Sequence, residues 1–281
     1  MKRRSVLMIT VSMVLLAMAI PGFAAARRNL PGFSTTALPA NDDGSTGQIS
    51  IGFTINLFGT SYSSLYVNNN GNVTFDASLG IFTPFSLTST ATKIIAPFFA
   101  DVDTRAGNVV TFGTSTVNGR NAFGVEWPGV GYYSVHTDKL NTFELVLIDR
   151  SDTGPGNFDF EFNYDSIQWN TGDASSGTGG FGGSPARVGY SNGLTGNANA
   201  SFELPGSAVD RAFIDGGPNS LIANSLNSGL AGRYVFNVRN GAINNPGPST
   251  VQGVPTMNLP VLAITGILLA CIAFYAKFRT A

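Results

Sequence analysis

The sequence predicts an all-β fold, an antiparallel β-sandwich, on three observations. The body of the chain is rich in Gly, Asn, Ser, Thr, Phe and Val and poor in Lys, Glu and Leu, a composition that favours strands and turns. No window shows the sustained i, i+3, i+4, i+7 spacing of an amphipathic helix. Short β-rich runs recur instead, and turn residues separate them.

The β-rich runs define the expected strands in order along the chain. In residues 49–58 apolar side chains alternate with polar ones, so one face of that strand should be buried. Residues 158–164 alternate phenylalanine with polar residues in the same way. Residues 93–99 are apolar nearly throughout, which indicates a buried strand. The other expected strands are residues 64–67, 72–75, 109–112, 122–127, 140–149, 187–190 and 233–238.

Two Asn-Gly pairs predict hairpins between neighbouring strands. They are Asn70-Gly71 and Asn118-Gly119. Tight hairpin turns need left-handed backbone, which Asn and Gly tolerate best. Residues 173–185 form a loop rich in Gly and Ser, and residues 27–48 a mostly irregular lead-in segment, so the β domain should span residues 49–240.

The first 26 residues have the layout of a secretory signal peptide. Three cations at residues 2–4 precede an apolar run at residues 6–20, and a Pro-Gly pair at residues 21–22 ends it. Small side chains then offer a cleavage site to signal peptidase, at Ala24, Ala25 and Ala26. This order predicts that the rest of the chain is exported.

A second apolar run, residues 259–276, lies within a C-terminal segment at residues 257–281. At a rise of about 1.5 Å per residue, this run is just long enough for a transmembrane helix. Lys277 and Arg279 follow it and favour a cytoplasmic end. A spacer rich in Pro and Gly, residues 241–256, separates it from the β domain. We therefore expect an exported body tethered to the membrane by its tail.

Charge and cysteine usage narrow the class of protein. All 17 acidic residues lie between the two terminal segments, whereas several of the 16 lysines and arginines lie within those segments. The exported body is therefore net acidic and has no electrostatic reason to bind nucleic acid or anionic lipid. The single cysteine, Cys271, lies in the C-terminal apolar run, so the body has neither a disulfide nor a cysteine metal site. These features suit a bacterial envelope protein.

Asp101 and Asp103 are the candidate metal ligands. They follow an apolar strand with a spacing of two, which would place both on one face if the strand continued. With backbone oxygens they could chelate a hard cation such as Ca²⁺, although the twelfth position of an EF-hand loop would be Phe112. The pattern favours the alternative, in which they hydrogen-bond a turn. The Asn-Asp-Asp-Gly segment at residues 41–44 is also expected as a turn.

The aromatic residues are the other candidates for binding. The alternate spacing within residues 158–164 favours a core position for its phenylalanines, and we expect the same of Phe98 and Phe99. Trp127 and Trp169 remain candidate ligand contacts. We expect no catalytic residue and no cofactor other than Ca²⁺. The only histidine, His136, lies in an expected loop, and no G-x-S-x-G elbow accompanies it.

Five segments resemble, in order, the motifs of the nidogen-like (NIDO) extracellular domain, which occurs in nidogen, in tectorin, in a membrane mucin and in exported bacterial proteins. The resemblance implies cell-matrix adhesion or matrix association, with no catalytic role and no defined binding site. The segments are LYVNNNGNVTF at residues 65–75, IAPFFADVD at 95–103, NTFELVL at 141–147, FEFNYDSIQW at 160–169 and ARVGY at 186–190.

The tail is similar to the bacterial sorting signals of the PEP-CTERM and IPTL-CTERM type. These combine a short Pro-bearing motif, here Val254, Pro255 and Thr256, with a transmembrane helix and a basic end. The resemblance implies recognition by an exosortase-like transpeptidase and transfer to the cell surface. Permanent anchoring in the membrane is the alternative.

Three functions follow from these features. The leading one is a non-enzymatic surface protein that binds extracellular matrix, exopolysaccharide or a neighbouring cell. Turns at residues 68–72, 101–108 and 172–184 are the expected contact regions. The second is a carbohydrate-binding module that uses Trp127 or Trp169. The third, a hydrolase that uses Asp101, Asp103 or Glu126, has least support because paired carboxylates need a cleft and a set separation.

Overall fold

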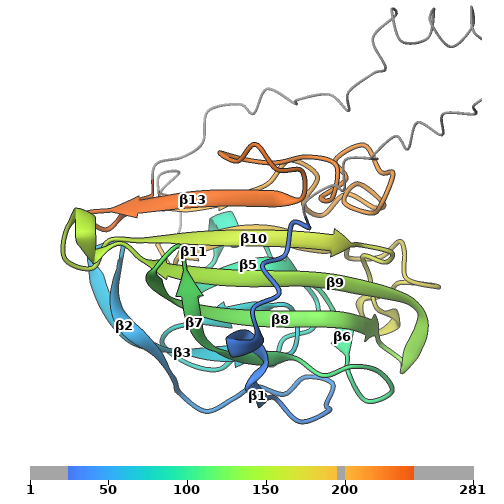
Figure 1. Cartoon of the computed structure of the whole chain (residues 1–281). Coiled ribbons are helices and arrows are strands. Elements are labelled where there is room, and N and C mark those ends of the chain that lie inside the picture. Colours follow the sequence, from blue (N-terminus) through green and yellow to red (C-terminus); the bar gives the residue numbers. More distant parts are fainter. Residues whose placement is uncertain (1–24, 195–199, 244–281) are drawn as a thin grey trace, which may run out of the picture.

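The computed structural model describes residues 25–194 and 200–243 and shows two antiparallel β-sheets packed face to face (Figure 1). Every pairing between named strands is antiparallel. No α-helix occurs in this part of the chain, and the helical turns present are short 3₁₀ segments. The predicted all-β sandwich is confirmed.

The larger sheet has eight strands in the order β1-β7-β8-β9-β10-β13-β14, with β6 paired to β8. Long strands at its centre, β8 to β10, span the molecule (Figure 1). Its members are β1 (Thr36–Ala37), β6 (Val102–Asp103), β7 (Thr111–Val117), β8 (Arg120–Tyr132), β9 (His136–Asp149), β10 (Phe158–Ser166), β13 (Arg233–Arg239) and β14 (Ala242–Ile243).

The smaller sheet has six strands in the order β12-β11-β5-β4-β3-β2. The chain passes from this sheet to the larger one directly after β5, because β6 pairs with β8. The strands of the smaller sheet are β2 (Ile49–Leu57), β3 (Thr60–Asn68), β4 (Asn72–Thr74), β5 (Lys93–Phe99), β11 (Arg187–Asn192) and β12 (Ser201–Glu203).

Both predicted Asn-Gly hairpins are present. Asn118 and Gly119 join β7 to β8 with φ angles of 51° and 76°, the pair of left-handed residues that a type I′ turn requires. Gly71 lies in the β3–β4 turn with a φ of 73°. A side chain at Gly71 would overlap the carbonyl oxygen of Phe98, so this close approach also requires glycine.

The main core lies between the sheets and is strongly aromatic. Phe160 of the larger sheet stacks on Phe236 at 4.6 Å between ring centroids and meets Tyr190 of the smaller sheet edge to face at 5.8 Å. The predicted buried positions are confirmed. Phe98, Phe158, Phe160 and Phe162 lie in this core, and Phe99 lies in a separate buried cluster with Leu87, Ile94 and Ala96.

The outer face of the larger sheet is covered by the lead-in segment, which runs across β10, β9 and β8 (Figure 1). The polar residues that alternate with the core phenylalanines of β10 are therefore buried rather than exposed. Arg28 donates two hydrogen bonds to Glu161, at 2.7 and 2.6 Å, and its backbone N–H donates to Glu144. The periodicity predicted the inward face correctly but contained no sign of this cover.

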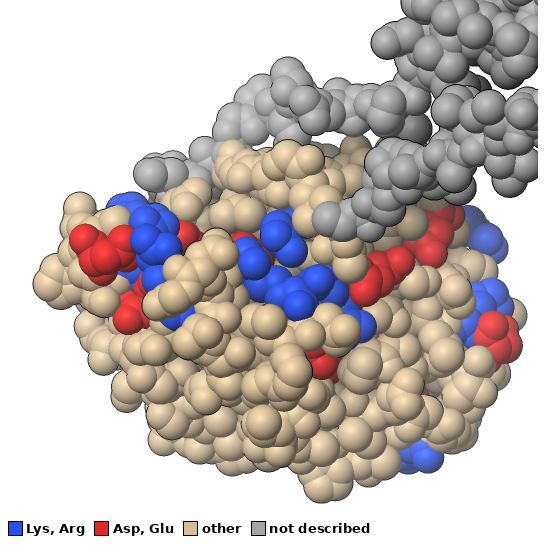
Figure 2. Space-filling model, viewed as in Figure 1, with Lys and Arg blue, Asp and Glu red and all other residues tan. Residues whose placement is uncertain are grey.

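Charged side chains of both signs lie close together on this face (Figure 2). The ion pairs formed there join Arg27 to Glu126 at 3.5 Å and Arg28 to Glu161 at 2.6 Å. Toward one end, Arg150 and Arg239 both contact Asp159 at 2.7 Å. Each of these four arginines is therefore paired with a carboxylate on the same face.

Some predictions differ from the structure, and others concern residues that the structure does not describe. The short strands β1, β6, β12 and β14 were not predicted, because two or three residues carry no periodic signal. His136 begins β9 instead of lying in a loop. Within the described residues, no helix has the length and apolar character to cross a membrane. The apolar run of the signal, the C-terminal run and the sorting motif at residues 254–256 lie outside the described residues.

Candidate functional site

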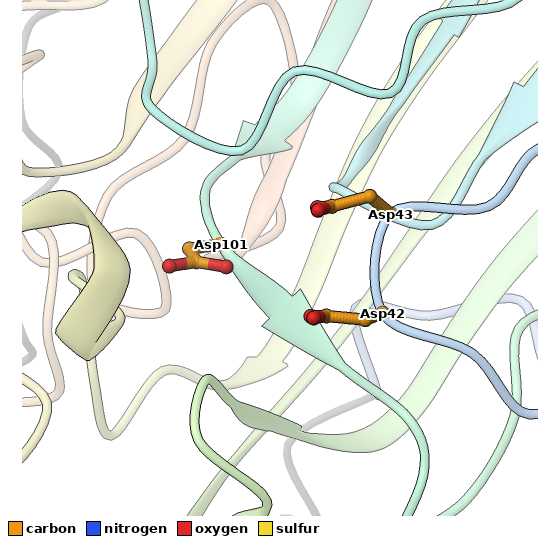
Figure 3. Close-up of side chains that lie close together, drawn as sticks. All are labelled: Asp42, Asp43 and Asp101. Carbon is orange, nitrogen blue, oxygen red and sulfur yellow. The ribbon is translucent and has the colours of Figure 1, made fainter.

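Three aspartates converge where the chain crosses between the two sheets. Asp42 and Asp43 lie in the turn of the lead-in segment, and Asp101 lies between β5 and β6. A carboxylate oxygen from each residue lies within 4.8 Å of those of the other two. Figure 3 shows the Asp42 and Asp43 side chains directed from one side toward Asp101. We call these three residues the aspartate cluster.

Asp101 is buried in the cluster without a hydrogen-bond partner. Its residue is 1% exposed, and neither carboxylate oxygen accepts a hydrogen bond. The backbone of Gly172 lies against this carboxylate so closely that a methyl group there would overlap it. Burial, together with the charges of Asp42, Asp43 and Asp103, raises the pKa of Asp101 to about 7. The nearby Ser175 backbone N–H opposes this shift, but its hydrogen bond is donated to the Gly172 carbonyl oxygen at 3.1 Å.

Asp103 has a different environment from Asp101. Arg105 donates to both of its oxygens, at 2.9 and 2.5 Å, and the Val135 backbone N–H donates to it at 2.8 Å. Burial raises the pKa of Asp103, but the hydrogen bonds from Arg105 and Val135 outweigh burial and lower it below its ordinary value. The two predicted ligands are therefore separated, because the strand stops at Phe99 and restarts in the other sheet at Val102.

A buried asparagine turn holds the cluster in place. Asn70 donates from Nδ2 to Asp43 Oδ1 at 2.8 Å and accepts from the Val102 backbone N–H at 2.9 Å. Asn69 donates to the backbone oxygens of Asp42 and Val102. The family-like segments at residues 65–75 and 95–103 thus meet at the aspartate cluster, and the turn at residues 68–72, expected as a contact region, is buried.

The electrostatics of the cluster favour a cation. Burial, Asp43 and Asp103 raise the pKa of Asp42 to about 6, against the opposing effect of Arg105. Arg105 approaches Asp42 at 3.3 Å but is already paired with Asp103. Three carboxylates with one shared arginine form a site of excess negative charge with oxygen donors only, which is the donor set of hard cations.

The two tryptophans lie inside the core. Neither Trp127 nor Trp169 is exposed. Their indole N–H groups donate to the backbone oxygens of Asn69 and Val130, respectively, at 3.0 and 3.1 Å. Because sugar stacking requires an exposed ring, the structure gives no support to the carbohydrate platform predicted on these residues.

The remaining predicted residues have structural surroundings. Glu126 is 4% exposed and lies beside Arg27, on the covered outer face and not in a pair with Asp101. Ala25 is exposed, and Ala26 is buried, with its carbonyl oxygen accepting from Arg233. Ala24 and the residues Val254, Pro255 and Thr256 lie outside the described residues.

The sequence did not predict that Asp42 and Asp43 lie beside Asp101. Residues 41–44 form the predicted turn, but Asp101 lies 57 positions after Gly44, and a turn motif does not indicate its tertiary neighbours. The one available signal was the excess of carboxylates without matching cations in both segments.

Comparison with known proteins defines the class. The chain belongs to the family described as Nidogen-like domain, which matches residues 63–118 and 110–240. It is 32% identical over 244 residues to alpha-tectorin of Mus musculus, with 78% of this chain and 11% of the relative covered. Alpha-tectorin of Gallus gallus is 31% identical over 229 residues (72% and 10% covered), and Nidogen of Drosophila melanogaster is 30% identical over 120 residues (34% and 9% covered).

The chain therefore spans about a tenth of the length of these relatives. No solved structure matches it. The predicted nidogen-like domain is confirmed. This likeness does not test the prediction that the protein is of bacterial type, nor the prediction of a C-terminal sorting signal.

Proposed function

We propose that the chain is an exported, surface-associated protein without catalytic activity, whose nidogen-like domain binds extracellular matrix. The observation that carries this proposal is the match of the Nidogen-like domain family across residues 63–240, together with the likeness to alpha-tectorin and nidogen. The partner is a matrix polymer, either protein or exopolysaccharide, or the surface of a neighbouring cell.

Two features of the sequence support export. The cationic, apolar and small-residue order of residues 1–26 is that of a signal peptide, and signal peptidase would cut after the Ala24–Ala26 run. The apolar run near the C-terminus, followed by Lys277 and Arg279, would then hold the domain at the membrane. Recognition of Val254, Pro255 and Thr256 by an exosortase-like transpeptidase would convert that anchor into surface attachment.

The described fold suits a rigid binding module. Two large sheets share one aromatic core, and the covered outer face ties the lead-in segment to the larger sheet. Loops at the sheet ends are then held on a stable scaffold, an arrangement that suits recognition. The predicted contact loop 172–184 carries exposed polar residues beside the 3₁₀ segment η4 (Asp173–Ser175).

Surface labelling and attachment test the proposal. Cells that make the full chain are compared with cells lacking the gene, using an antibody on intact cells and a matrix-coated surface. We expect surface labelling, loss of the first 26 residues, and a several-fold fall in attachment without the gene. The intact chain inside the cell with its first residues retained, or unchanged attachment, would overturn the proposal. Digestion of the matrix with protease or glycosidase separates the two kinds of polymer.

A further inference from the structure

The aspartate cluster has an unbalanced charge at a buried position. Asp101 is 1% exposed, has no hydrogen-bond partner on either oxygen, and faces the carboxylates of Asp42 and Asp43. An ionised carboxylate buried without a partner costs several kcal/mol by order of magnitude, and nearby like charges add to that cost. Such an arrangement persists in folded proteins when a proton or a cation compensates it.

No cation of the described chain compensates Asp101. Arg105, which contacts the cluster through Asp42, donates three hydrogen bonds to Asp103 from its backbone and side chain. Asp42 Oδ1 also lacks a hydrogen-bond partner. Two residues from different parts of the chain thus present free carboxylate oxygens toward the same small volume.

The backbone of two glycines lies close to the cluster. Gly172 packs directly against the Asp101 carboxylate, and a side chain at that position would occupy the same space. Gly80 approaches the Asp43 backbone so that an added methyl group would lie 3.0 Å from its carbonyl oxygen. Asn70 fixes one oxygen of Asp43. The carboxylates are therefore positioned by neighbouring backbone and amide groups.

The spacing fits a single metal ion. Ca²⁺ binds oxygen ligands at roughly 2.3–2.6 Å, so two of its ligands lie at most about 5 Å apart. One carboxylate oxygen from each of the three residues lies within 4.8 Å of the other two. The site offers oxygen donors only and lacks the nitrogen and sulfur ligands that Zn²⁺ prefers. Mg²⁺ demands near-ideal octahedral geometry, whereas Ca²⁺ accepts irregular sets completed by water.

We propose that the aspartate cluster binds one Ca²⁺ ion through Asp42, Asp43 and Asp101. The ion joins the lead-in segment to the crossing between the two sheets, two parts of the chain that are far apart in sequence. It therefore stabilises the domain and holds the turn at residues 41–44 against the loops around residues 80 and 172. Asp103 keeps its pairing with Arg105 and is not a ligand.

Calorimetry and thermal unfolding of the purified full chain test this proposal. The protein is first stripped with a chelator and then titrated with CaCl₂ or MgCl₂. We expect one Ca²⁺ per chain, a rise in the melting temperature with Ca²⁺, and at least tenfold weaker binding of Mg²⁺. Binding of Ca²⁺ is read by heat and melting temperature, so its failure is distinct from failure of matrix attachment.

Variants assign the binding to the cluster. Asp101→Asn keeps the shape but removes one ligand charge, and Asp42→Asn with Asp43→Asn removes two. Each should weaken Ca²⁺ binding at least tenfold. Asp152→Asn is the matched control, because it removes the same charge from a surface ion pair with Arg120. Circular dichroism establishes folding of each variant, and Asp101→Asn is expected to fold because neutral Asn relieves the buried charge.

Each outcome of these measurements either supports or overturns the proposed Ca²⁺ site. Wild-type binding that Asp101→Asn and the double variant lose, while Asp152→Asn keeps it, supports the proposal. Absence of heat and of a melting shift at millimolar Ca²⁺ overturns it. Binding that persists unchanged in Asp101→Asn also overturns it, because the ion would then lie elsewhere.

Discussion

Asn70 and Asp43 are joined by a hydrogen bond of 2.8 Å from the buried asparagine amide to the carboxylate. The same asparagine accepts from the backbone N–H of Val102, on the far side of the β5–β6 crossing. One side chain therefore fixes the turn of the lead-in segment relative to the residue next to Asp101. The family-like asparagine turn thus acts in this chain as the support of the aspartate cluster.

Replacing Asn70 with Asp should destabilise the domain. The new carboxylate would face Asp43 without a proton to donate, at a position that is fully buried. We expect a loss of about 2–4 kcal/mol in the free energy of unfolding at neutral pH. Urea denaturation measures it, with Asn108→Asp as the control, because Asn108 makes a single hydrogen bond near the surface. Equal losses for both variants would contradict the role given to Asn70.

Arg28 should contribute to stability through the covered outer face. Its removal leaves Glu161, 4% exposed, with the more distant guanidinium of Arg233 at 3.8 Å and a hydrogen bond from Asn163 at 3.3 Å. For Arg28→Ala we expect a loss of about 2–3 kcal/mol, below the full effect of breaking a buried pair because Arg233 remains. Arg120→Ala, which breaks an exposed pair with Asp152, should cost about 1 kcal/mol or less.

Chemical denaturation of these two arginine variants measures whether the lead-in segment contributes more to the free energy of unfolding than an ordinary surface segment. If Arg28→Ala is no more destabilising than Arg120→Ala, residues 27–38 do not form part of the cooperative domain. The result would then favour the domain boundary near residue 49 that the sequence predicts.

Without Ca²⁺, stability should fall as pH rises. The pKa of Asp101 is about 7 in the folded chain against 3.8 for an ordinary aspartate, so the folded chain holds a proton that the unfolded chain has released between these values. Stability then decreases from about pH 4 to about pH 7, by on the order of 2–4 kcal/mol for this group. Asp42, with a pKa of about 6, acts in the same direction.

Other carboxylates also contribute to the pH dependence, so the difference between wild type and Asp101→Asn is the informative quantity. Burial of Glu144 raises its pKa and adds to the fall, whereas the lowered pKa of Asp103 acts in the opposite direction at lower pH. Free energies of unfolding at pH 4.5 and 7.5 in chelator should show a smaller fall for the variant. Equal pH dependence of the two proteins would show that Asp101 is not the group responsible.

Gly172 should be intolerant of even a methyl group. Its φ of −84° is open to any residue, so the restriction comes from the Asp101 carboxylate that fills the space above it. We expect Gly172→Ala to cost about 1–3 kcal/mol and to weaken Ca²⁺ binding. Gly47→Ala is the control, because open space surrounds that position. Thermal unfolding with and without Ca²⁺ measures both effects, and a harmless Gly172→Ala would contradict this packing.

The sequence determined the fold class and the long strands because both depend on local signals. The alternation predicted in residues 49–58 and 158–164 agrees with β2 and β10, and both Asn-Gly turns are present. The short strands escaped detection, and the polar face of β10 could not be recognised as buried. Its cover comes from Arg28, more than a hundred residues away along the chain, and alternation contains no information about such a distant segment.

The site was predicted only in part for the same reason. The spacing of Asp101 and Asp103 suggested a shared face, but the chain changes sheets between them. Asp103 accepts hydrogen bonds from Arg105, two residues away, whereas Asp101 lies beside the turn at residues 41–44. The tryptophans were ambiguous in sequence because an indole serves equally in a core or on a surface. Their burial follows from the pairing of two sheets that the local pattern does not specify.

A crystal structure of the full chain grown with millimolar Ca²⁺ tests the aspartate cluster most directly. We predict one anomalous-scattering peak, roughly 2.3–2.6 Å from oxygens of Asp42, Asp43 and Asp101, with Asp103 still paired to Arg105. Absence of a peak at those three carboxylates, with water or a protonated Asp101 in its place, would contradict the proposed site.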